Sequence, residues 1–197
     1  MLSLLNEEPM QLRVMITMLV FTGMRRGELC GLEWKDIDFD QRTISICRTS
    51  QYIGRGKNLI TKEPKTRSGI RKLSVGENLC RLLKSYRKFQ MLERLRVGDR
   101  WVDTDRLFTQ WNGEPIHPDT VTEGFAKFLK RHDLPKVTLH SLRHSNATLM
   151  IAEGVDIRTV SNRLGHAQTS TTLNIYSHAL KSRDQDAADK LDAALNF

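Results

Sequence analysis

Four short segments of the sequence carry side chains that could do chemistry on a phosphate ester. They are Thr22–Leu29, Pro64–Thr66, His140–His144, and Leu164–His166 with Tyr176 following ten residues later. Together they supply arginines, a lysine, histidines and a tyrosine, without a pair of carboxylates, a cluster of metal ligands or a glycine-rich phosphate loop. These residue types favour displacement at phosphorus without a metal ion or a nucleotide cofactor.

Such a displacement needs three kinds of group. Two guanidiniums can bind the negative charge that builds up on the non-bridging oxygens in the transition state. A lysine or a histidine can protonate the departing alkoxide, which is otherwise a poor leaving group. A tyrosine oxygen can attack phosphorus and form a covalent phosphotyrosine. The new bond keeps the energy of the old one, so rejoining would need no ATP.

Each of these residues has an ordinary explanation when it is taken alone. Arg25 and Arg26 could be solvated surface charges, and Lys65 is one lysine among many. His140 could be a core histidine, and Tyr176 could be a buried tyrosine with a paired hydroxyl. Because short motifs recur by chance, the functional hypothesis rests on the whole set.

The ordered segments resemble the boxes of the tyrosine recombinase family, and most closely those of integrases from phages and conjugative transposons of Gram-positive bacteria. The family's first box reads T-G-x-R-x-x-E-L, which Thr22–Leu29 matches, and its sheet lysine lies in a turn like Pro64–Thr66. The family's H-x-x-R is met by His140–Arg143, its L-G-H by Leu164–His166, and its nucleophile by Tyr176. The resemblance covers essentially the whole chain. It implies a site-specific recombinase or integrase that cleaves and rejoins DNA, with the family's catalytic fold.

The resemblance implies four residues that act at or near the scissile phosphate. Arg25 and Arg143 would bind it, and His166 would donate a hydrogen bond to one of its oxygens. Glu28, three residues after Arg25, is a candidate for orienting a guanidinium. Arg26 is the alternative to Arg25 as the phosphate ligand, although the register of the T-G-x-R box favours Arg25.

The resemblance also implies the groups that make bonds and move protons. Tyr176 would be the nucleophile that forms a 3′-phosphotyrosyl link, and His140 would assist proton transfer there. Lys65 would be the general acid toward the 5′ hydroxyl that leaves. No cofactor or metal is expected, and His132, His144 and His178 receive no catalytic role.

The charge balance fits a nucleic-acid partner. Lysines and arginines number 31 against 23 acidic residues, giving a formal net charge of +8. A basic balance of this size favours polyanions such as double-stranded DNA. The longest apolar run, Val14–Phe21, is too short to span a bilayer, so we expect no membrane association. Three widely spaced cysteines indicate a reducing cytosol. The resemblance implies that this is the cytoplasm of a bacterium.

Apolar periodicity predicts a mostly helical α+β domain with a small antiparallel sheet, of about three strands, near the N-terminal third. The expected strands are Thr43–Ile46, Asn58–Thr61 and Lys72–Val75. The expected helices are Leu12–Phe21, Arg26–Trp34, one from Glu77, one from Pro118, Ser141–Glu153, Asp156–Leu164, Ser170–Leu180 and the tail.

The domain prediction is a catalytic domain over residues 1–197, with a helical C-terminal tail at 181–197. The resemblance implies that the family's N-terminal core-binding and arm-binding domains are absent here. It also implies that protomers assemble as a synaptic tetramer on DNA. The apolar face of the tail could pack on its own domain or on a neighbouring protomer, and amphipathicity does not choose between them.

Two other functions fit part of the pattern. A type IB topoisomerase would use the same chemistry, but the boxes resemble those of integrases more. A non-enzymatic DNA-binding protein could keep the fold, but the complete set of candidate catalytic residues argues against it.

Overall fold

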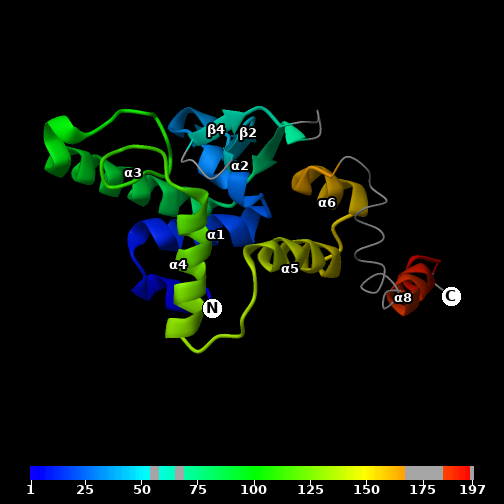
Figure 1. The fold of residues 1–197 in the computed structure, drawn as a ribbon. Coiled ribbons are helices and arrows are strands. Elements are labelled where there is room, and N and C mark those ends of the chain that lie inside the picture. The colour runs from blue at the N-terminus through cyan, green and yellow to red at the C-terminus, as the bar shows by residue number, and fades with distance from the viewer. Residues whose placement is uncertain (54–57, 65–68, 167–183, 196–197) are drawn as a thin grey trace.

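A computed structural model of the chain describes residues 1–53, 58–64, 69–166 and 184–195 (Figure 1). The helices of this part are α1 (Met10–Thr22), α2 (Arg26–Gly31), α3 (Glu77–Val97), α4 (Pro118–Arg131), α5 (Leu139–Ala152), α6 (Ile157–Leu164) and α8 (Asp184–Leu195). Its strands are β1 (Ile37–Asp38), β2 (Thr43–Ile46), β3 (Thr49–Ile53), β4 (Asn58–Lys62) and β5 (Arg71–Ser74). Short 3-10 turns lie at Ser3–Glu7, Trp34–Asp36 and Gly98–Arg100. The mostly helical α+β class predicted from sequence is confirmed.

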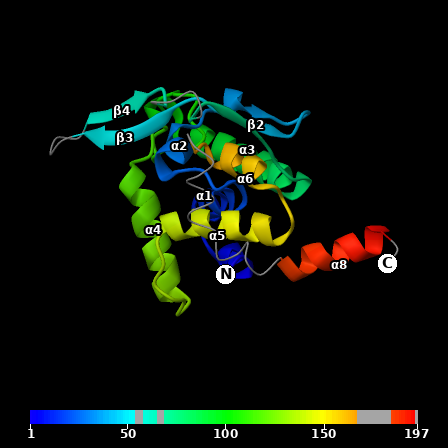
Figure 2. The same ribbon diagram turned by 90° about the vertical axis from the view of Figure 1, so that its right-hand side faces the viewer.

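Helix α1 forms the centre of the core. Its residues Val14, Ile16 and Met18 are fully buried, because α3, α4 and α5 all pack against it. Figures 1 and 2 show α1 in the middle of the molecule, with the strands along one edge and α5 beside it. A helix covered on several sides needs apolar residues nearly all round, which explains the dense apolar run in the sequence.

The strands form two small antiparallel sheets. One has the order β1-β2-β5, with Ile44 opposite Leu73, and both of these side chains are buried. The other is a hairpin of β3 and β4, in which Ser50 lies opposite Thr61. All three predicted strands are present, but Asn58–Thr61 pairs with β3 rather than with the other two. The hydroxyl groups of Ser50 and Thr61 share a hydrogen bond of 2.9 Å that links the hairpin strands.

The predicted helix ends are largely confirmed by their caps. Gly23 ends α1 in the left-handed conformation with φ of 63°. Asp156 caps α6 by accepting a hydrogen bond from the Thr159 amide at 2.9 Å. Several boundaries differ from the expectation: α1, for example, begins at Met10 rather than at Leu12. Helix α2 ends at Gly31, because Leu32 is extended, and α5 begins at Leu139, because the preceding Thr138 is its N-cap.

Helix α8 lies away from the α1–α4 core in both views (Figures 1 and 2). Its apolar residues Leu191 and Leu195 are 60% and 66% exposed. Among the described helices, none is both long enough and apolar enough to cross a membrane. The helix predicted at Ser170–Leu180 lies outside the described residues.

Candidate active site

Arg25 is held at the entrance to α2 by Glu28. The Glu28 carboxylate accepts hydrogen bonds from the Arg25 backbone amide at 2.8 Å and from its Nη1 at 2.9 Å. The same arrangement caps the N-terminus of α2, so the T-G-x-R-x-x-E-L spacing serves local structure as well as chemistry. The Arg25 side chain remains 49% exposed, which leaves its guanidinium accessible to an anion from outside.

Glu28 is buried and shared with a second arginine. Arg71 donates to its two carboxylate oxygens from Nη1 at 3.1 Å and from Nη2 at 2.8 Å. Burial alone would raise the pKa of Glu28, but the hydrogen bonds and charge of Arg71, with the Arg25 amide, lower it below its usual value. The carboxylate therefore stays ionised and keeps both guanidiniums in place.

Arg143 is buried, in contrast to Arg25, with 4% of its surface exposed. Its Nη1 donates to the Gly23 carbonyl at 2.7 Å, and its Nη2 donates to the Leu164 carbonyl at 2.6 Å. These contacts join α5 to the ends of α1 and α6. Both carbonyls belong to helix C-termini, where backbone acceptors lack partners within the helix. The guanidinium is thus fixed by groups from two of the other boxes.

His166 follows α6 directly and lies close to both arginines. Arg25 Nη2 contacts the carbonyl of Gly165 at 3.4 Å, and the His166 amide donates to the Ser161 carbonyl at 3.1 Å. Burial, then the positive charges of Arg143 and Arg25, lower the pKa of His166 to about 4. The imidazole is therefore neutral at pH 7 and can donate a hydrogen bond without carrying charge.

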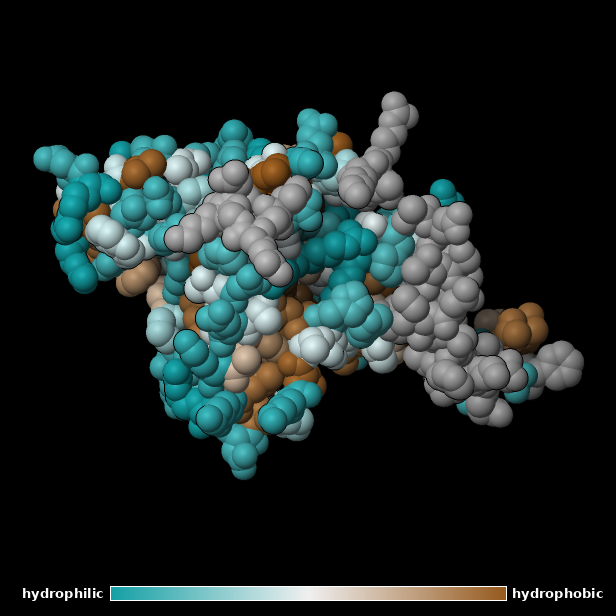
Figure 3. Space-filling view, viewed as in Figure 1, coloured by the Kyte–Doolittle hydropathy of each residue, from teal (hydrophilic) through white to brown (hydrophobic). Residues whose placement is uncertain are grey.

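One open cavity of about 380 Å³ brings three of the predicted residues together. Arg25, His140 and Arg143 line it, at the junction of α2, α4 and α5. Met24 and Leu139 add apolar surface to the same cavity. On the face shown in Figure 3, hydrophobic residues gather between α4 and α5, with hydrophilic residues around them. The cavity thus places cationic groups beside apolar side chains.

The structure places four of the six predicted catalytic residues in one region: Arg25, His140, Arg143 and His166. Glu28 joins them through Arg25. Lys65 and Tyr176 lie outside the described residues, so their roles stay predictions. Pro64 and Gly69, which flank the lysine turn, are described and pack closely against each other.

Of the histidines that were given no catalytic role above, His132 and His144 are described. His132 contacts the buried carboxylate of Glu8 at 3.1 Å, as a structural residue would. His144 lies edge-on to His140, with ring centroids 4.5 Å apart. His178 lies outside the described residues.

Sequence reasoning missed Arg71. A signal was present, because Arg71 is two residues from Leu73 in the same strand and therefore shares its face. Opposite them on β2 lie Ile46 and Ile44, which are both buried. A charged residue on the core face of a strand indicates a buried ion pair. In the structure the partner of Arg71 in this pair is Glu28.

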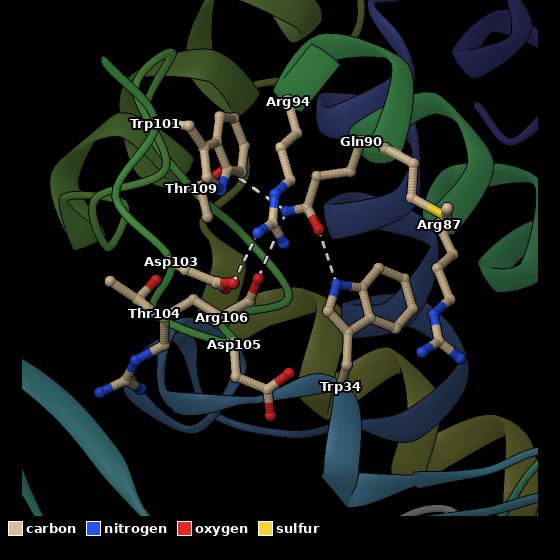
Figure 4. A pocket seen from close by; sticks show the side chains of 11 residues that line it. Trp34, Arg87, Gln90, Arg94, Trp101, Asp103, Thr104, Asp105, Arg106 and Thr109 are labelled. Atoms are coloured by element: carbon tan, nitrogen blue, oxygen red, sulfur yellow. Dashed lines mark hydrogen bonds and ion pairs between the residues drawn. The ribbon is translucent and has the colours of Figure 1, made fainter. Parts of the chain in front are cut away.

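A separate cavity of about 250 Å³ lies between α3 and the segment that follows it (Figure 4). Gln90 accepts a hydrogen bond from Trp34 Nε1 at 2.6 Å, and Arg94 pairs with Asp103 at 2.9 Å. Of the predicted catalytic residues that the structure describes, none lines this cavity. Its polar groups hold the segment after α3 onto the core, so the candidate active site is the Arg25–Arg143 cavity.

Comparison with known proteins identifies the family. A profile of the phage integrase family matches residues 1–183. The chain is 31% identical over 194 residues to the ICEBs1 integrase of Bacillus subtilis, covering 98% of this chain and 52% of that protein. It is also 31% identical over 192 residues to a XerC-like tyrosine recombinase of Caldanaerobacter subterraneus, covering 92% of this chain and 49% of that protein. The chain belongs to the phage integrase family, as the resemblance of its boxes implied.

A solved structure agrees with this assignment. The Tn1549 transposon integrase, in complex with transposon right end DNA, superposes with a TM-score of 0.79 at 27% identity. The match covers 100% of this chain and 63% of that one. The tyrosine recombinase catalytic fold predicted from sequence is therefore confirmed. The chain spans about half the length of the curated relatives that it matches.

The low pKa of His166 predicts a pH dependence of stability. In the unfolded chain this histidine takes up a proton near pH 6.5, but in the folded chain only near pH 4. Between pH 6.5 and pH 4 the unfolded state thus binds more protons than the folded state. The contribution of His166 to the unfolding free energy is therefore fully present above pH 6.5 and is lost as the pH falls toward 4. We expect the gap in unfolding free energy between wild type and His166→Gln, measured in urea, to narrow from pH 7.5 to pH 5. A gap that is constant over this range would contradict the lowered pKa.

Proposed function

We propose that this chain cleaves and rejoins double-stranded DNA at specific sites through a covalent 3′-phosphotyrosyl link to Tyr176, without metal or ATP. Residues 1–197 are its catalytic domain, and 181–197 form a helical tail. The observation that carries the proposal is the convergence of Arg25, His140 and Arg143 on one open cavity, from segments more than a hundred residues apart. Such a protein works on bacterial DNA in the cytoplasm.

In the proposed reaction, Tyr176, His140 and Lys65 act in strand cleavage and act again, in reverse, when the strand is rejoined. The Tyr176 phenol oxygen attacks phosphorus and gives its proton to a base, with His140 assisting. The bond from phosphorus to the 5′ oxygen breaks, and the Lys65 ammonium donates a proton to that oxygen. Phosphorus is then bonded to the 3′ oxygen and to Tyr176. Attack by a 5′ hydroxyl reverses these steps, on the same strand or on a recombining one, and releases the tyrosine.

The described residues support the electrostatic part of this reaction. Arg25 is half exposed and can reach a phosphate from the cavity, while Arg143 is buried and rigidly held. The neutral His166 can donate to a phosphate oxygen without adding charge. Groups that are already oriented stabilise developing charge without reorganisation during the reaction.

A nicked suicide duplex tests the proposed function. On cleavage the duplex loses a short fragment that carries the free 5′ hydroxyl. Without this hydroxyl the covalent complex cannot be resealed. We expect wild type to form a complex that survives denaturation, and Tyr176→Phe to form none, because the attacking oxygen is gone. The measurement is the fraction of labelled DNA that migrates with protein in a denaturing gel. A complex that persists in Tyr176→Phe excludes Tyr176 as the nucleophile.

We also propose that α8 packs against a neighbouring protomer on DNA, in a synaptic tetramer. Leu191 and Leu195 are exposed, so their apolar surface is available to another chain. Exposed apolar side chains on one helix are a common feature of interaction sites.

Substitution on α8 tests that assembly. We expect Leu191→Glu to reduce the fraction of multimers on a recombination-site duplex about tenfold, because it replaces an apolar contact by a charge. Lys190→Gln, at the neighbouring exposed position, serves as the control. Analytical ultracentrifugation of the protein–DNA mixture gives both values. Equal multimer fractions for Leu191→Glu and wild type would mean that the tail does not join protomers.

A further inference from the structure

Arg25 and Arg26 are neighbours in the sequence, but their guanidiniums are held by different elements. Arg25 Nη2 contacts the Gly165 carbonyl at 3.4 Å, at the end of α6. Arg26 is held by α4 instead, because its Nη1 donates to Asp119 Oδ1 at 2.9 Å and to Thr122 Oγ1 at 2.7 Å. The two arginines thus have different neighbours and can bind different anionic groups.

A second open cavity, of about 340 Å³, shares part of its lining with the Arg25–Arg143 cavity. Arg25, Arg26 and Gly27 line both cavities, so the first turn of α2 is a wall common to the two. The rest of the second cavity is lined by β3 and by the start of α4, through Thr49, Ser50, Gln51, His117, Pro118 and Asp119. Two arginines face one carboxylate there, which favours the binding of an anion.

The guanidinium of Arg26 lies where the two cavities adjoin. Its partner Asp119 lines the second cavity, whereas its partner Thr122 lines the Arg25–Arg143 cavity. The Arg26 side chain is 40% exposed, so solvent and a ligand can reach it. An anion that enters the second cavity therefore meets this guanidinium.

The contacts with α4 leave one edge of the Arg26 guanidinium available. Both contacts are made by a single nitrogen, Nη1. Among the described residues, neither Nε nor Nη2 of Arg26 has a hydrogen-bond partner. These two nitrogens form one edge of the planar group, and they can donate in parallel to two oxygens of one phosphate. Asp119 and Thr122 therefore orient this edge without using it.

A DNA strand carries one phosphate per nucleotide, about 3.4 Å apart along the helix axis. When the scissile phosphate lies between Arg25 and Arg143, the next phosphate of the strand comes within reach of the adjoining cavity. We infer that Arg26 binds this next phosphate, and that Asp119 and Thr122 hold its guanidinium in place. The inference rests on the proposed function, because that function makes double-stranded DNA the substrate. It assigns different phosphates to Arg25 and Arg26, which the sequence left as alternatives for one.

Equilibrium binding tests the role of Arg26. Fluorescence anisotropy of a labelled duplex is measured over a range of salt concentrations, in a Tyr176→Phe background so that no bond to Tyr176 forms. We expect Arg26→Gln to lower the slope of log affinity against log salt by about 1, and to weaken binding about tenfold at low salt. Arg96→Gln makes the same change of charge at an exposed arginine in the last turn of α3, and should leave the slope unchanged. Equal decreases in both variants would show that Arg26 acts through net charge alone, and would overturn the inference.

Thr122→Val tests whether the hold on Arg26 matters. This change removes the hydroxyl that binds Nη1 and leaves the charge of the protein unchanged. We expect it to weaken binding about threefold when Arg26 is present and to add nothing to Arg26→Gln, because its effect passes through the guanidinium. Thr120→Val, at another exposed threonine of α4, is the matched control and should bind as wild type does. Additive losses in the Arg26→Gln, Thr122→Val double variant would contradict the holding role.

Uncharged phosphate analogues locate the contact. In a suicide duplex, single phosphates are replaced in turn by methylphosphonates, which carry no negative charge. We expect Arg26→Gln to weaken binding about tenfold when the methylphosphonate is at the scissile position, but less than about twofold when it is at one of the two adjacent positions. A tenfold loss that persists at both adjacent positions overturns the assignment. Because only binding is measured, a protein that meets these expectations but forms no covalent complex through Tyr176 contradicts the proposed cleavage and leaves the phosphate site standing.

Discussion

Replacing Arg143 by lysine is expected to reduce DNA cleavage by about 1000-fold, the size of effect seen when one preorganised donor to a transition state is lost. The lysine keeps the charge, but a single ammonium cannot donate to the Gly23 and Leu164 carbonyls and also to a phosphate oxygen. The measurement is the single-turnover rate of covalent complex formation on the suicide duplex.

The same substitution is expected to lower stability, since a buried carbonyl without its donor costs about 1–3 kcal/mol. Arg158→Lys is the matched control, because Arg158 is exposed on α6. Urea unfolding of both variants separates loss of fold from loss of chemistry. If Arg143→Lys cleaves within about threefold of wild type, the fork of Arg143 is not needed for the reaction.

Replacing Gly23 by alanine is the second change that we expect to have a large effect, here on the unfolding free energy. Gly23 has φ of 63°, and an added Cβ would lie 2.7 Å from both Asn146 Oδ1 and Leu164 Cδ2. The left-handed conformation and the overlap together predict a loss of unfolding free energy of about 2–4 kcal/mol. The Gly23 carbonyl also accepts from Arg143, so displacement there should slow cleavage as well.

The control for this change is Gly76→Ala. Gly76 has an ordinary backbone conformation and nothing within 4 Å of the added Cβ. Its unfolding free energy should stay within about 1 kcal/mol of wild type. Urea titration at pH 7.5 gives both values. Equal unfolding free energies of the two alanine variants would contradict this prediction. They would show that α1, α5 and α6 can make room for a side chain at Gly23 without loss of stability.

Much of the local structure was predictable because its causes are local. Pro118 at the first turn of α4, Asp156 at the cap of α6 and Gly23 at the end of α1 act within a few residues. The pairing of strands was less predictable. The hairpin of β3 and β4 forms apart from the other sheet, and Arg106, more than forty residues after Thr61, binds it at 2.8 Å. No local pattern contains that contact.

The sequence by itself determined the family and predicted a type of chemistry, because its residue types follow one another in an order that few families share. Four ordered boxes that contain arginines, histidines, a lysine and a tyrosine were sufficient to identify the family. Only the tertiary structure decided what each arginine does. Arg25 is half exposed, Arg143 is buried against two helix ends, and Arg71 joins Glu28 to the carbonyl of Gly69. Burial and pairing depend on groups brought together across the fold, and identical side chains acquire different roles from the partners they meet there.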